Sequence, residues 1–322
     1  MNAATARAGA NIALVKYWGK RDSTLNLPAA GSLSITLDAL ETVTRVELMP
    51  GLDADRFELD GQAADPTPIS RVLDLLRPAC GPRCRVTSRN NFPTGAGLAS
   101  SASGFAALVV AAAAVFQPDL ERSALSALAR RGSGSAARSV FGGFCEMPAG
   151  QAEDGSDCFA RQLAEPGHWP LEVVVAVTEQ GPKAVSSRDG MNRTMATSPY
   201  YPAWVASVPA DLERARRAIV DRDFAELAAV SEHSALKMHA SALAAQPGLL
   251  YWNAATLACL ARIRDLRQNG LDVFFTVDAG PQVKAVCLPG RGDAVAAELA
   301  AMDGVQQVLH SGLGAGARLV DS

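Results

Sequence analysis

The stretch NFPTGAGLASSASGFAALVVAAAAVF, residues 91–116, places a glycine- and serine-rich turn directly before a long apolar run. Pro93, Gly95 and Gly97 allow tight or left-handed backbone, and the apolar run predicts a buried helix. Such a turn leaves backbone N–H groups free at the helix N-terminus, where the helix dipole also attracts anions. Taken alone, the stretch has two interpretations of about equal weight. It either binds phosphate, or it is a core helix that its serines cap.

The P-loop of nucleotide-binding ATPases is excluded for this turn. That loop needs Gly-Lys-Ser/Thr at its end, and no lysine lies between Arg89 and Arg131. We also find no Ser in a G-x-S-x-G elbow, which leaves little support for nucleophilic hydrolase chemistry.

The composition indicates a globular enzyme. The chain has 322 residues, 48% hydrophobic and 20% charged, which predicts a sizeable core and two domains. A net charge of −3 gives no general signature of nucleic-acid or membrane binding. No apolar run reaches the roughly 20 residues that span a bilayer, and the N-terminus lacks a signal-peptide pattern. We therefore expect a cytoplasmic protein.

Cysteine and histidine do not form a metal-binding pattern. The six cysteines are scattered, and we interpret them as reduced thiols that mostly pack. A single C-x3-C at Cys80 and Cys84 without a second half is weak evidence for zinc. Because the four histidines form no H-E-x-x-H motif, a transition metal held by protein ligands is not expected.

The order of periodic segments predicts an α+β fold of two lobes, with mixed or antiparallel sheets packed against helices. Strand-like segments precede residue 91, and residues 171–180 are a nearly continuous apolar run typical of a buried strand. The second half reads helix, strand, strand, helix and a last strand in VQQVLH. We place the boundary near residue 170, giving domains 1–170 and 171–322.

Three polar groups occupy positions where packing would prefer none. Lys16 and Lys20 are either solvated lysines at a strand end or phosphate donors. Arg138 lies in a second Gly/Ser turn, GSGSAARSVFGG, and is either an anion ligand or a surface charge. Asp278 ends an apolar strand, where a carboxylate is costly to bury unless paired, although an Asx-type turn is the simpler interpretation of this motif alone.

Together with the donor-rich turn GPKAVSSRDGM, these groups supply two anion sites, several cations and one buried carboxylate. That set suits the transfer of a phosphoryl group to a small anionic substrate.

The chain resembles the GHMP kinase superfamily and, within it, the mevalonate diphosphate decarboxylase family. The resemblance covers most of the chain, from about residue 10 to SGLGAGARLV, and rests on five segments in the family's order. These are NIALVKYWGKRDSTLNLPAAGSLSITLD, NNFPTGAGLASSASGFAAL, GSGSAARSVFGGF, GPKAVSSRDGM and FTVDAGP.

The resemblance implies a two-lobed GHMP kinase-like fold with the active site between the lobes. It also implies ATP-dependent decarboxylation of mevalonate 5-diphosphate to isopentenyl diphosphate through phosphorylation of the 3-hydroxyl. By similarity, Asp278 orients or deprotonates that hydroxyl, Lys16 lies beside it, and Arg138 binds the substrate carboxylate.

The resemblance further assigns ligand-binding residues. The substrate would be held, largely through its diphosphate, by Tyr17, Lys20, Ser135, Ser187 and Arg188. The ATP phosphates would be held by Gly95, Gly97, Leu98, Ala99, Ser100, Ser101 and Ser133. Magnesium would bind with ATP, near Ser101, and a homodimer is the family-like assembly.

One departure from the family and three alternatives stay open. Gln282 stands where we expect Asn, which puts fine positioning beside Asp278 in question. A small-molecule kinase would stop at phosphorylation, and a related decarboxylase would use the 5-phosphate. A non-catalytic binding protein on this scaffold would be expected to lose Asp278 or the phosphate loop, and both are present.

Overall fold

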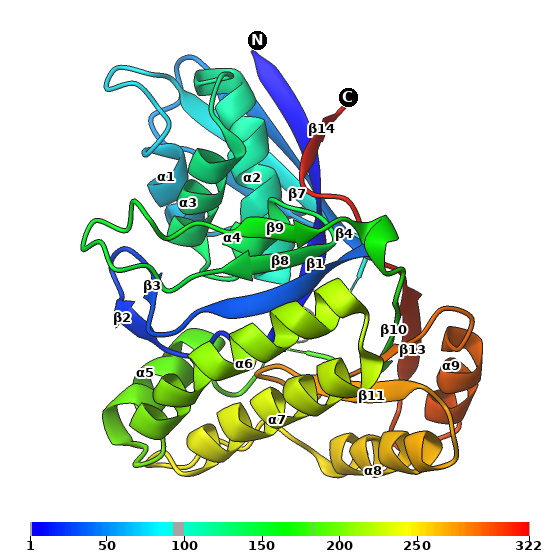
Figure 1. Ribbon diagram of the computed structural model, residues 1–322. Coiled ribbons are helices and arrows are strands. Elements are labelled where there is room, and N and C mark those ends of the chain that lie inside the picture. The colour runs from blue at the N-terminus through cyan, green and yellow to red at the C-terminus, as the bar shows by residue number, and fades with distance from the viewer. Residues whose placement is uncertain (1, 93–99, 182, 322) are drawn as a thin grey trace.

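The computed structural model describes residues 2–92, 100–181 and 183–321 (Figure 1). Its strands are β1 (Ala3–Val15), β2 (Lys20–Asp22), β3 (Leu27–Pro28), β4 (Ser32–Met49), β5 (Arg56–Leu59), β6 (Gln62–Ala64), β7 (Arg83–Asn90), β8 (Phe144–Met147), β9 (Arg161–Ala164), β10 (Glu172–Val177), β11 (Val273–Val277), β12 (Val283–Cys287), β13 (Gln307–Ser311) and β14 (Arg318–Val320). Its helices are α1 (Thr67–Leu73), α2 (Ser100–Phe116), α3 (Arg122–Gly132), α4 (Ala136–Ser139), α5 (Ser187–Thr197), α6 (Tyr201–Asp221), α7 (Phe224–Leu243), α8 (Ala254–Gln268) and α9 (Gly292–Ala300), with a 3₁₀ turn at Pro166–His168.

The first sheet is built on the long antiparallel pair β1 and β4. Its strand order is β14-β1-β4-β7-β5-β6, and β8 and β9 extend from β4. One face carries small residues such as Ala6 and Ala8, against which the alanine-rich helix α2 packs. The apolar run that opened the sequence analysis therefore forms the predicted buried helix, described from Ser100 onward.

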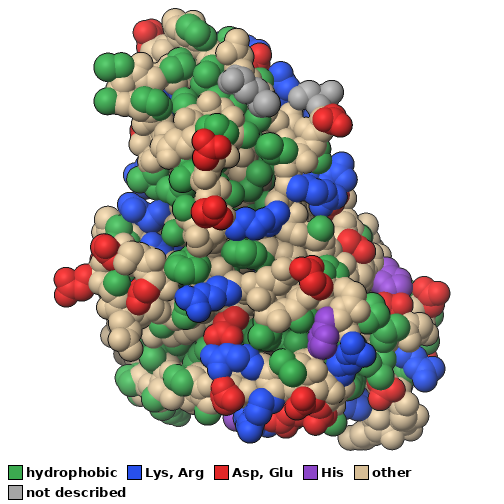
Figure 2. Space-filling view, turned by 45° about the horizontal axis from the view of Figure 1, so that its top comes forward, with side chains coloured by type: hydrophobic (Ala, Val, Ile, Leu, Met, Phe, Trp, Pro, Cys, Tyr) green, Lys and Arg blue, Asp and Glu red, His purple; other side chains and the backbone are tan. Residues whose placement is uncertain are grey.

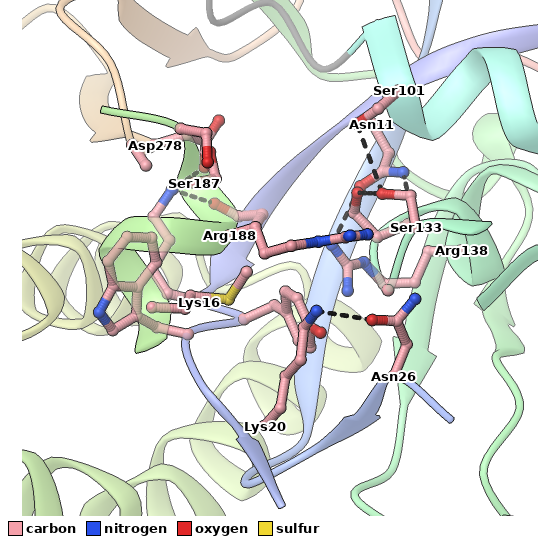
Figure 3. Close-up of a pocket in the computed structure, with 18 of the residues that line it drawn as sticks. Asn11, Lys16, Lys20, Asn26, Ser101, Ser133, Arg138, Ser187, Arg188 and Asp278 are labelled. Carbon is pink, nitrogen blue, oxygen red and sulfur yellow. Dashed lines mark hydrogen bonds and ion pairs between the residues drawn. The ribbon is translucent and has the colours of Figure 1, made fainter. Parts of the chain in front are cut away.

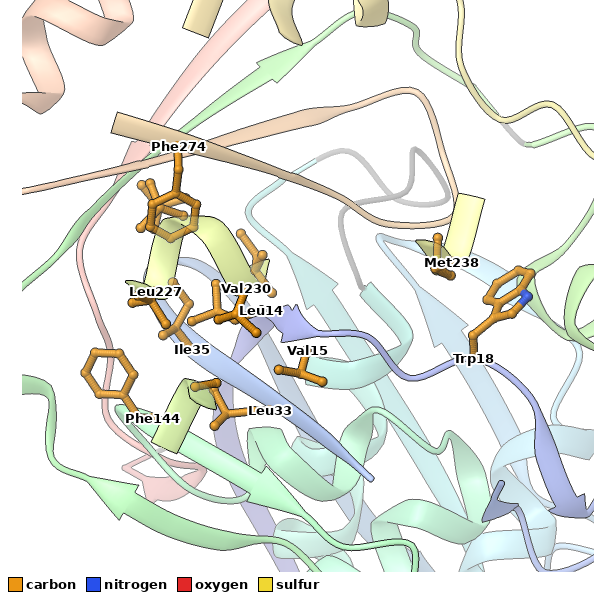
Figure 4. Close-up of a cluster of buried hydrophobic side chains, with 14 of the residues drawn as sticks. Leu14, Val15, Trp18, Leu33, Ile35, Phe144, Leu227, Val230, Met238 and Phe274 are labelled. Atoms are coloured by element: carbon orange, nitrogen blue, oxygen red, sulfur yellow. The ribbon is translucent and has the colours of Figure 1, made fainter. Parts of the chain in front are cut away.

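A layer of two helices, α6 and α7, separates the first sheet from the second. One hydrophobic cluster joins residues of β1 and β4, of both helices, and of the second sheet. In Figure 4, Leu227 and Val230 of α7 lie between Phe274 of β11 and Leu33 of β4. This shared core fixes the end of β1 relative to the end of β11.

The second sheet has the order β11-β12-β10-β13, and all of its pairs are antiparallel. Alternate residues of β10 face opposite sides, with Val173 and Val175 in the cluster of α6 and α7, and Val174 and Ala176 in the cluster of α8 and α9. Because both faces are covered by helices, the strand reads as a continuous apolar run, as the sequence predicted.

The end of the chain differs from the sequence-based expectation. VQQVLH forms β13 as predicted, but it is not the last strand, because β14 returns to pair with β1 in the first sheet. Both termini consequently lie together at the top of Figure 1. A three-residue strand has too little periodicity to be recognised in sequence. The boundary near residue 170 stays a prediction.

The described surface carries mixed charge. On the face shown in Figure 2, acidic and basic side chains are interspersed, which fits the small net charge of −3. Within the described ranges, no helix has the length and apolar character that crossing a membrane would require. Five of the six cysteines are buried, and Cys80 is exposed.

The helix layer between the sheets makes a testable contribution to stability. We expect Leu227→Ala to lower the free energy of unfolding by roughly 2–5 kcal/mol, because truncation leaves a cavity in the central core. Leu227 is fully buried, whereas Leu243 on the same helix is 46% exposed. Leu243→Ala is therefore the matched control, with an expected change of about 0.5 kcal/mol or less. Urea unfolding of both variants measures the difference, and equal losses would contradict the assigned core.

Candidate active site

A cleft of about 550 Å³ lies where the end of β1, the starts of α2 and α5, the segment around α4 and the turn after β11 meet. Eleven of the residues singled out from sequence line it, namely Lys16, Tyr17, Lys20, Ser100, Ser101, Ser133, Ser135, Arg138, Ser187, Arg188 and Asp278. In Figure 3, Asp278 and Lys16 lie on one side of this cleft, and Ser101, Ser133 and Arg138 lie on the other. The topology thus brings Ser100 and Ser101, at the start of α2, to the same cleft as Ser133 and Ser135 of the second Gly/Ser turn.

Asp278, directly after β11, forms an ion pair with Lys16, directly after β1. Lys16 Nζ donates to Asp278 Oδ1 at 2.7 Å and to the carbonyl of Ala13 at 2.8 Å. The same carbonyl accepts a hydrogen bond from Thr276 Oγ1 at 3.1 Å, which ties the end of β1 to β11. Lys16 is only 1% exposed, so the solvated-lysine alternative is wrong for it.

A second ammonium, Lys284 of β12, lies 3.2 Å from Asp278 Oδ2. Burial alone would raise the pKa of the Asp278 carboxyl, but Lys16 and Lys284 together hold that pKa below its ordinary value. The carboxylate is therefore ionised, with its side chain 27% exposed to the cleft. Burial lowers the pKa of Lys16 to about 8, against the opposing attraction of Asp278.

The turn at Asp278 is closed by backbone, since Gly280 N–H donates to the Asp278 carbonyl at 2.7 Å. The carboxylate itself is directed to the lysines, so the Asx-type turn does not account for this side chain.

Arg138 is fixed by three side chains of the first sheet. Its Nε donates to Ser34 Oγ at 2.9 Å, one terminal nitrogen to Ser32 Oγ at 2.6 Å, and the other to Asn11 Oδ1 at 3.1 Å. The side chain is 1% exposed, so the surface-charge alternative is wrong. Burial lowers the pKa of Arg138 to about 10, which leaves it protonated at neutral pH. A guanidinium has five N–H groups, so two remain for a ligand.

Tyr17 supplies a buried hydroxyl to the cleft wall. Among the described residues, no group hydrogen-bonds to this hydroxyl. Burial raises the pKa of Tyr17, so it is a neutral donor. The hydroxyl lies against Gly134, where any Cβ would overlap the tyrosine ring. Gly134 in the second Gly/Ser turn is thus required for the close approach of Tyr17.

Lys20 is held by an asparagine that the sequence analysis missed. Its Nζ donates to Asn26 Oδ1 at 2.6 Å, and Asn26 Nδ2 donates to the carbonyl of Arg131 at 2.7 Å. Asn26 has a φ of 53°, in the left-handed region that asparagine tolerates better than most residues. Burial, with repulsion from Arg188, lowers the pKa of Lys20 to about 8.

The serines of the two turns face each other. Ser101 Oγ lies 3.4 Å from Ser133 Oγ, and Ser133 Oγ lies 3.3 Å from Ser135 Oγ. Ser103 instead hydrogen-bonds to Thr42 at 2.6 Å in the interior, so it belongs to the core. The other residues expected to hold ATP phosphates, Gly95, Gly97, Leu98 and Ala99, lie outside the described residues.

Helix α5 carries Ser187 and Arg188 at its first turn, after Ser186 caps it by accepting from Asp189 N–H. Lys183 Nζ donates to Ser187 Oγ at 3.2 Å. Burial, with repulsion from Lys284, lowers the pKa of Lys183 to about 8. Figure 3 shows Arg188 reaching into the cleft toward Ser133.

Gln282, the departure from the family pattern, does not line the cleft. Its Oε1 accepts from Thr178 N–H at 2.7 Å, and its Nε2 donates to the Glu179 carbonyl at 2.6 Å. The glutamine side chain, which is one methylene longer than the expected asparagine, thus joins the Asp278 turn to the segment after β10. That segment leads to Lys183.

A smaller, mostly apolar pocket of about 240 Å³ adjoins the cleft and shares Ser100, Ser101 and Phe105 with it. Its walls are Phe57, Leu59, Pro68, Ile69, Val86 and Leu108, with Thr42, Ser88, Asn90 and Gly104. No sequence motif pointed to this pocket, because its walls come from five separate elements and most of their side chains are ordinary core types.

Lysine usage was the overlooked signal for the cationic residues. The chain has 30 basic residues but only five lysines, at positions 16, 20, 183, 237 and 284. Three of them line the cleft and Lys284 lies behind Asp278, whereas Lys237 pairs with Asp211 elsewhere. Because the other basic residues of this chain are arginines, the position of a lysine is itself a signal for the site.

Two sequence families match the chain. Residues 8–160 match the family described as Diphosphomevalonate decarboxylase-like N-terminal domain. Residues 173–297 match the family described as Mevalonate 5-diphosphate decarboxylase C-terminal domain. A curated relative, Diphosphomevalonate decarboxylase of Saccharomyces cerevisiae, is 39% identical over 300 residues, which cover 86% of this chain and 76% of the relative.

Solved structures agree with the sequence relatives. Mevalonate diphosphate decarboxylase from Staphylococcus aureus superposes with a TM-score of 0.93 at 35% identity, covering 99% of this chain and 98% of that one. The structure of MDDEF in complex with MVAPP, AMPPCP and magnesium superposes with a TM-score of 0.92 at 38% identity, covering 99% of both chains.

The cationic cleft generates a prediction about pH. We expect the affinity for inorganic pyrophosphate to fall as pH rises from about 7 to 9, because Lys20 and Lys183 lose their protons as pH passes their pKa of about 8. The loss is at most roughly tenfold per pH unit for each lysine that must be protonated. Isothermal titration calorimetry across this range measures it.

Lys20→Met should flatten this pH dependence, and Lys237→Met is the matched control because Lys237 pairs with Asp211 away from the cleft. A pyrophosphate affinity that is constant with pH would contradict the assignment of Lys20 and Lys183 as ligands. So would a pH dependence that both variants flatten equally.

Proposed function

The chain belongs to the diphosphomevalonate decarboxylase family, and from this premise we propose how its cleft performs the family's reaction. The reaction is ATP-dependent decarboxylation of mevalonate 5-diphosphate to isopentenyl diphosphate, with release of ADP, phosphate and CO2. The protein is thus a carboxy-lyase of the mevalonate pathway. The observation that carries the assignment of roles is the ionised Asp278 in a cleft whose other charged lining residues, among those described, are all cationic.

Asp278 is the group that handles the 3-hydroxyl in this proposal. A tertiary alcohol is a poor nucleophile, and a carboxylate within hydrogen-bond reach accepts its proton as the bond to phosphorus forms. Lys16, 2.7 Å from the same carboxylate, keeps it ionised and oriented. Its ammonium also offers positive charge beside the oxygen that gains the phosphoryl group.

Arg138 binds the substrate carboxylate in this proposal. Phosphorylation turns the 3-hydroxyl into a good leaving group, and phosphate departs with the C3–O bonding electrons. The electron pair of the bond to the carboxylate then forms the C=C bond, and CO2 is released. Because Arg138 is held by Ser32, Ser34 and Asn11, it fixes the carboxylate direction without rearrangement.

The substrate's diphosphate is bound away from the reacting carbon. Tyr17, Lys20 and Arg188 present a phenol, an ammonium and a guanidinium to the cleft, with Ser135 and Ser187 as hydroxyl donors. Binding energy from this remote group positions the 3-hydroxyl, which raises turnover more than it raises affinity.

ATP and magnesium fit the other side of the cleft. Ser100, Ser101 and Ser133 offer hydroxyls there, and the adjoining apolar pocket suits a purine, with Thr42, Ser88 and Asn90 as its polar partners. Among the described residues, no three His, Cys, Asp or Glu side chains gather as a metal site. Magnesium is therefore proposed to bind through the ATP phosphates beside Ser101. When bound, ATP with magnesium supplies the phosphoryl group.

Two expectations remain part of the proposal. The division into domains 1–170 and 171–322 is supported by the separate helix covers of the two sheets, whereas β14, which falls in the second range, pairs with β1 of the first sheet. The homodimer implied by the family resemblance also stays a prediction.

The reaction itself is tested by its products. With ATP, magnesium and mevalonate 5-diphosphate, we expect ADP, phosphate and CO2 in equal amounts. Turnover should be far faster than with the 5-phosphate, because Tyr17, Lys20 and Arg188 form a diphosphate-sized donor set. ADP formed together with a stable phosphorylated product, without CO2, would identify a kinase instead.

The role of Asp278 is tested by Asp278→Asn, which removes the charge and keeps the shape. Single-turnover ADP formation should fall by roughly 10²–10⁴-fold, since a general base is lost, while calorimetry still detects ATP and substrate binding. Asp211→Asn, at the other Lys–Asp pair, is the control and should leave the rate unchanged. A near-normal rate in Asp278→Asn would refute the catalytic assignment.

A further inference from the structure

Lys284 contacts Asp278 but is not among the residues that line the cleft. Its Nζ lies 3.2 Å from Asp278 Oδ2, while Lys16 binds Oδ1, so each carboxylate oxygen has its own ammonium. Lys284 is 2% exposed and does not line the cleft. Lys284 therefore acts on a bound substrate through Asp278, which it contacts, and through the field that it exerts on Lys16 and Lys183.

The sheet fixes Lys284 in this position. It lies on β12 between its register partners Thr276 of β11 and Val175 of β10. Its Nζ also donates to the Gln282 carbonyl at 3.3 Å. Thr276 on the same face binds the Ala13 carbonyl that also accepts from Lys16. Both lysines are thus anchored by backbone groups, which is the condition for holding a carboxylate in one orientation.

A structural role alone does not explain the second ammonium. Two buried ammoniums contact the two oxygens of the one Asp278 carboxylate. Burying an ammonium is costly even where it is paired, and one lysine would suffice to pair with this carboxylate. A second buried ammonium that contacts the catalytic carboxylate, despite its cost in folding free energy, indicates that Lys284 serves the reaction.

We propose that Lys284 is a positioning residue for the decarboxylase reaction, holding Asp278 Oδ2 so that the carboxylate faces the 3-hydroxyl as an ionised acceptor. The inference rests on the role proposed above for Asp278. It adds a residue that touches neither substrate nor ATP but determines how well the carboxylate acts.

The first test is the rate of the folded Lys284→Met variant, with ATP, magnesium and mevalonate 5-diphosphate. Methionine keeps the length of the side chain and removes the ammonium. We expect kcat to fall by about tenfold or more while KM changes by less than about threefold, because an interaction used in the transition state is lost. Lys237→Met is the matched control and should retain wild-type kcat, since neither Lys237 nor its partner Asp211 lines the cleft.

The outcomes separate this inference from the proposed function. A wild-type enzyme that releases no CO2 would refute the proposed function. An active wild type with kcat of Lys284→Met within about twofold would refute only the role of Lys284. A loss of KM alone, with kcat unchanged, would also refute it.

A second test uses stability and needs no activity. In Asp278→Asn the two ammoniums face a neutral amide and repel each other. Adding Lys284→Met to Asp278→Asn should therefore raise the melting temperature, although the same change does not raise it in the wild-type background. A decrease of equal size in both backgrounds would show that Lys284 is a packing residue with no electrostatic coupling to Asp278.

Discussion

A carboxylate at the end of a buried strand is the constraint on which the rest of this structure depends. Asp278 is tolerable there only with cationic partners, and one of them, Lys16, lies 262 positions earlier in the chain. Lys16 is itself fixed by helix α7, because its backbone N–H donates to Ser234 Oγ at 3.0 Å. Lys284 comes from the same sheet as Asp278, but both sheets and the helix layer between them must assemble before Lys16 can contact the carboxylate.

Local patterns were sufficient to predict most of the fold. The strand β10 and the helices α2 and α8 follow from apolar runs and periodicity, since these elements are buried on defined faces. The return of β14 to β1 was not predictable, because it depends on where the chain ends in space. The same holds for the layer of α6 and α7 between the two sheets, which only the shared core reveals.

The site was predictable where one turn holds several polar residues, and hidden where the partners come from distant elements. Tyr17, Arg138 and Asp278 lie in motifs that stand out from their surroundings. Asn26 and Lys284 do not, because their importance comes from what they touch, namely Lys20 and Asp278. The sequence showed Gln282 only as a departure from the Asn expected in the family. In the structure its side chain hydrogen-bonds to the backbone of Thr178 and Glu179, after the end of β10.

The charge of the cleft is opposite to that of the whole molecule. Lys16, Lys20, Arg138, Lys183 and Arg188 line it together with a single described carboxylate, in a chain of net charge −3. A concave, low-dielectric wall of one sign focuses its field outward, so polyanions are drawn in faster than by diffusion alone, and added salt weakens this steering. Decarboxylation then converts the substrate carboxylate to neutral CO2, and its negative charge leaves on inorganic phosphate. The same cations that speed capture therefore face, after each turnover, product anions that each carry less charge than ATP or the substrate, which favours release.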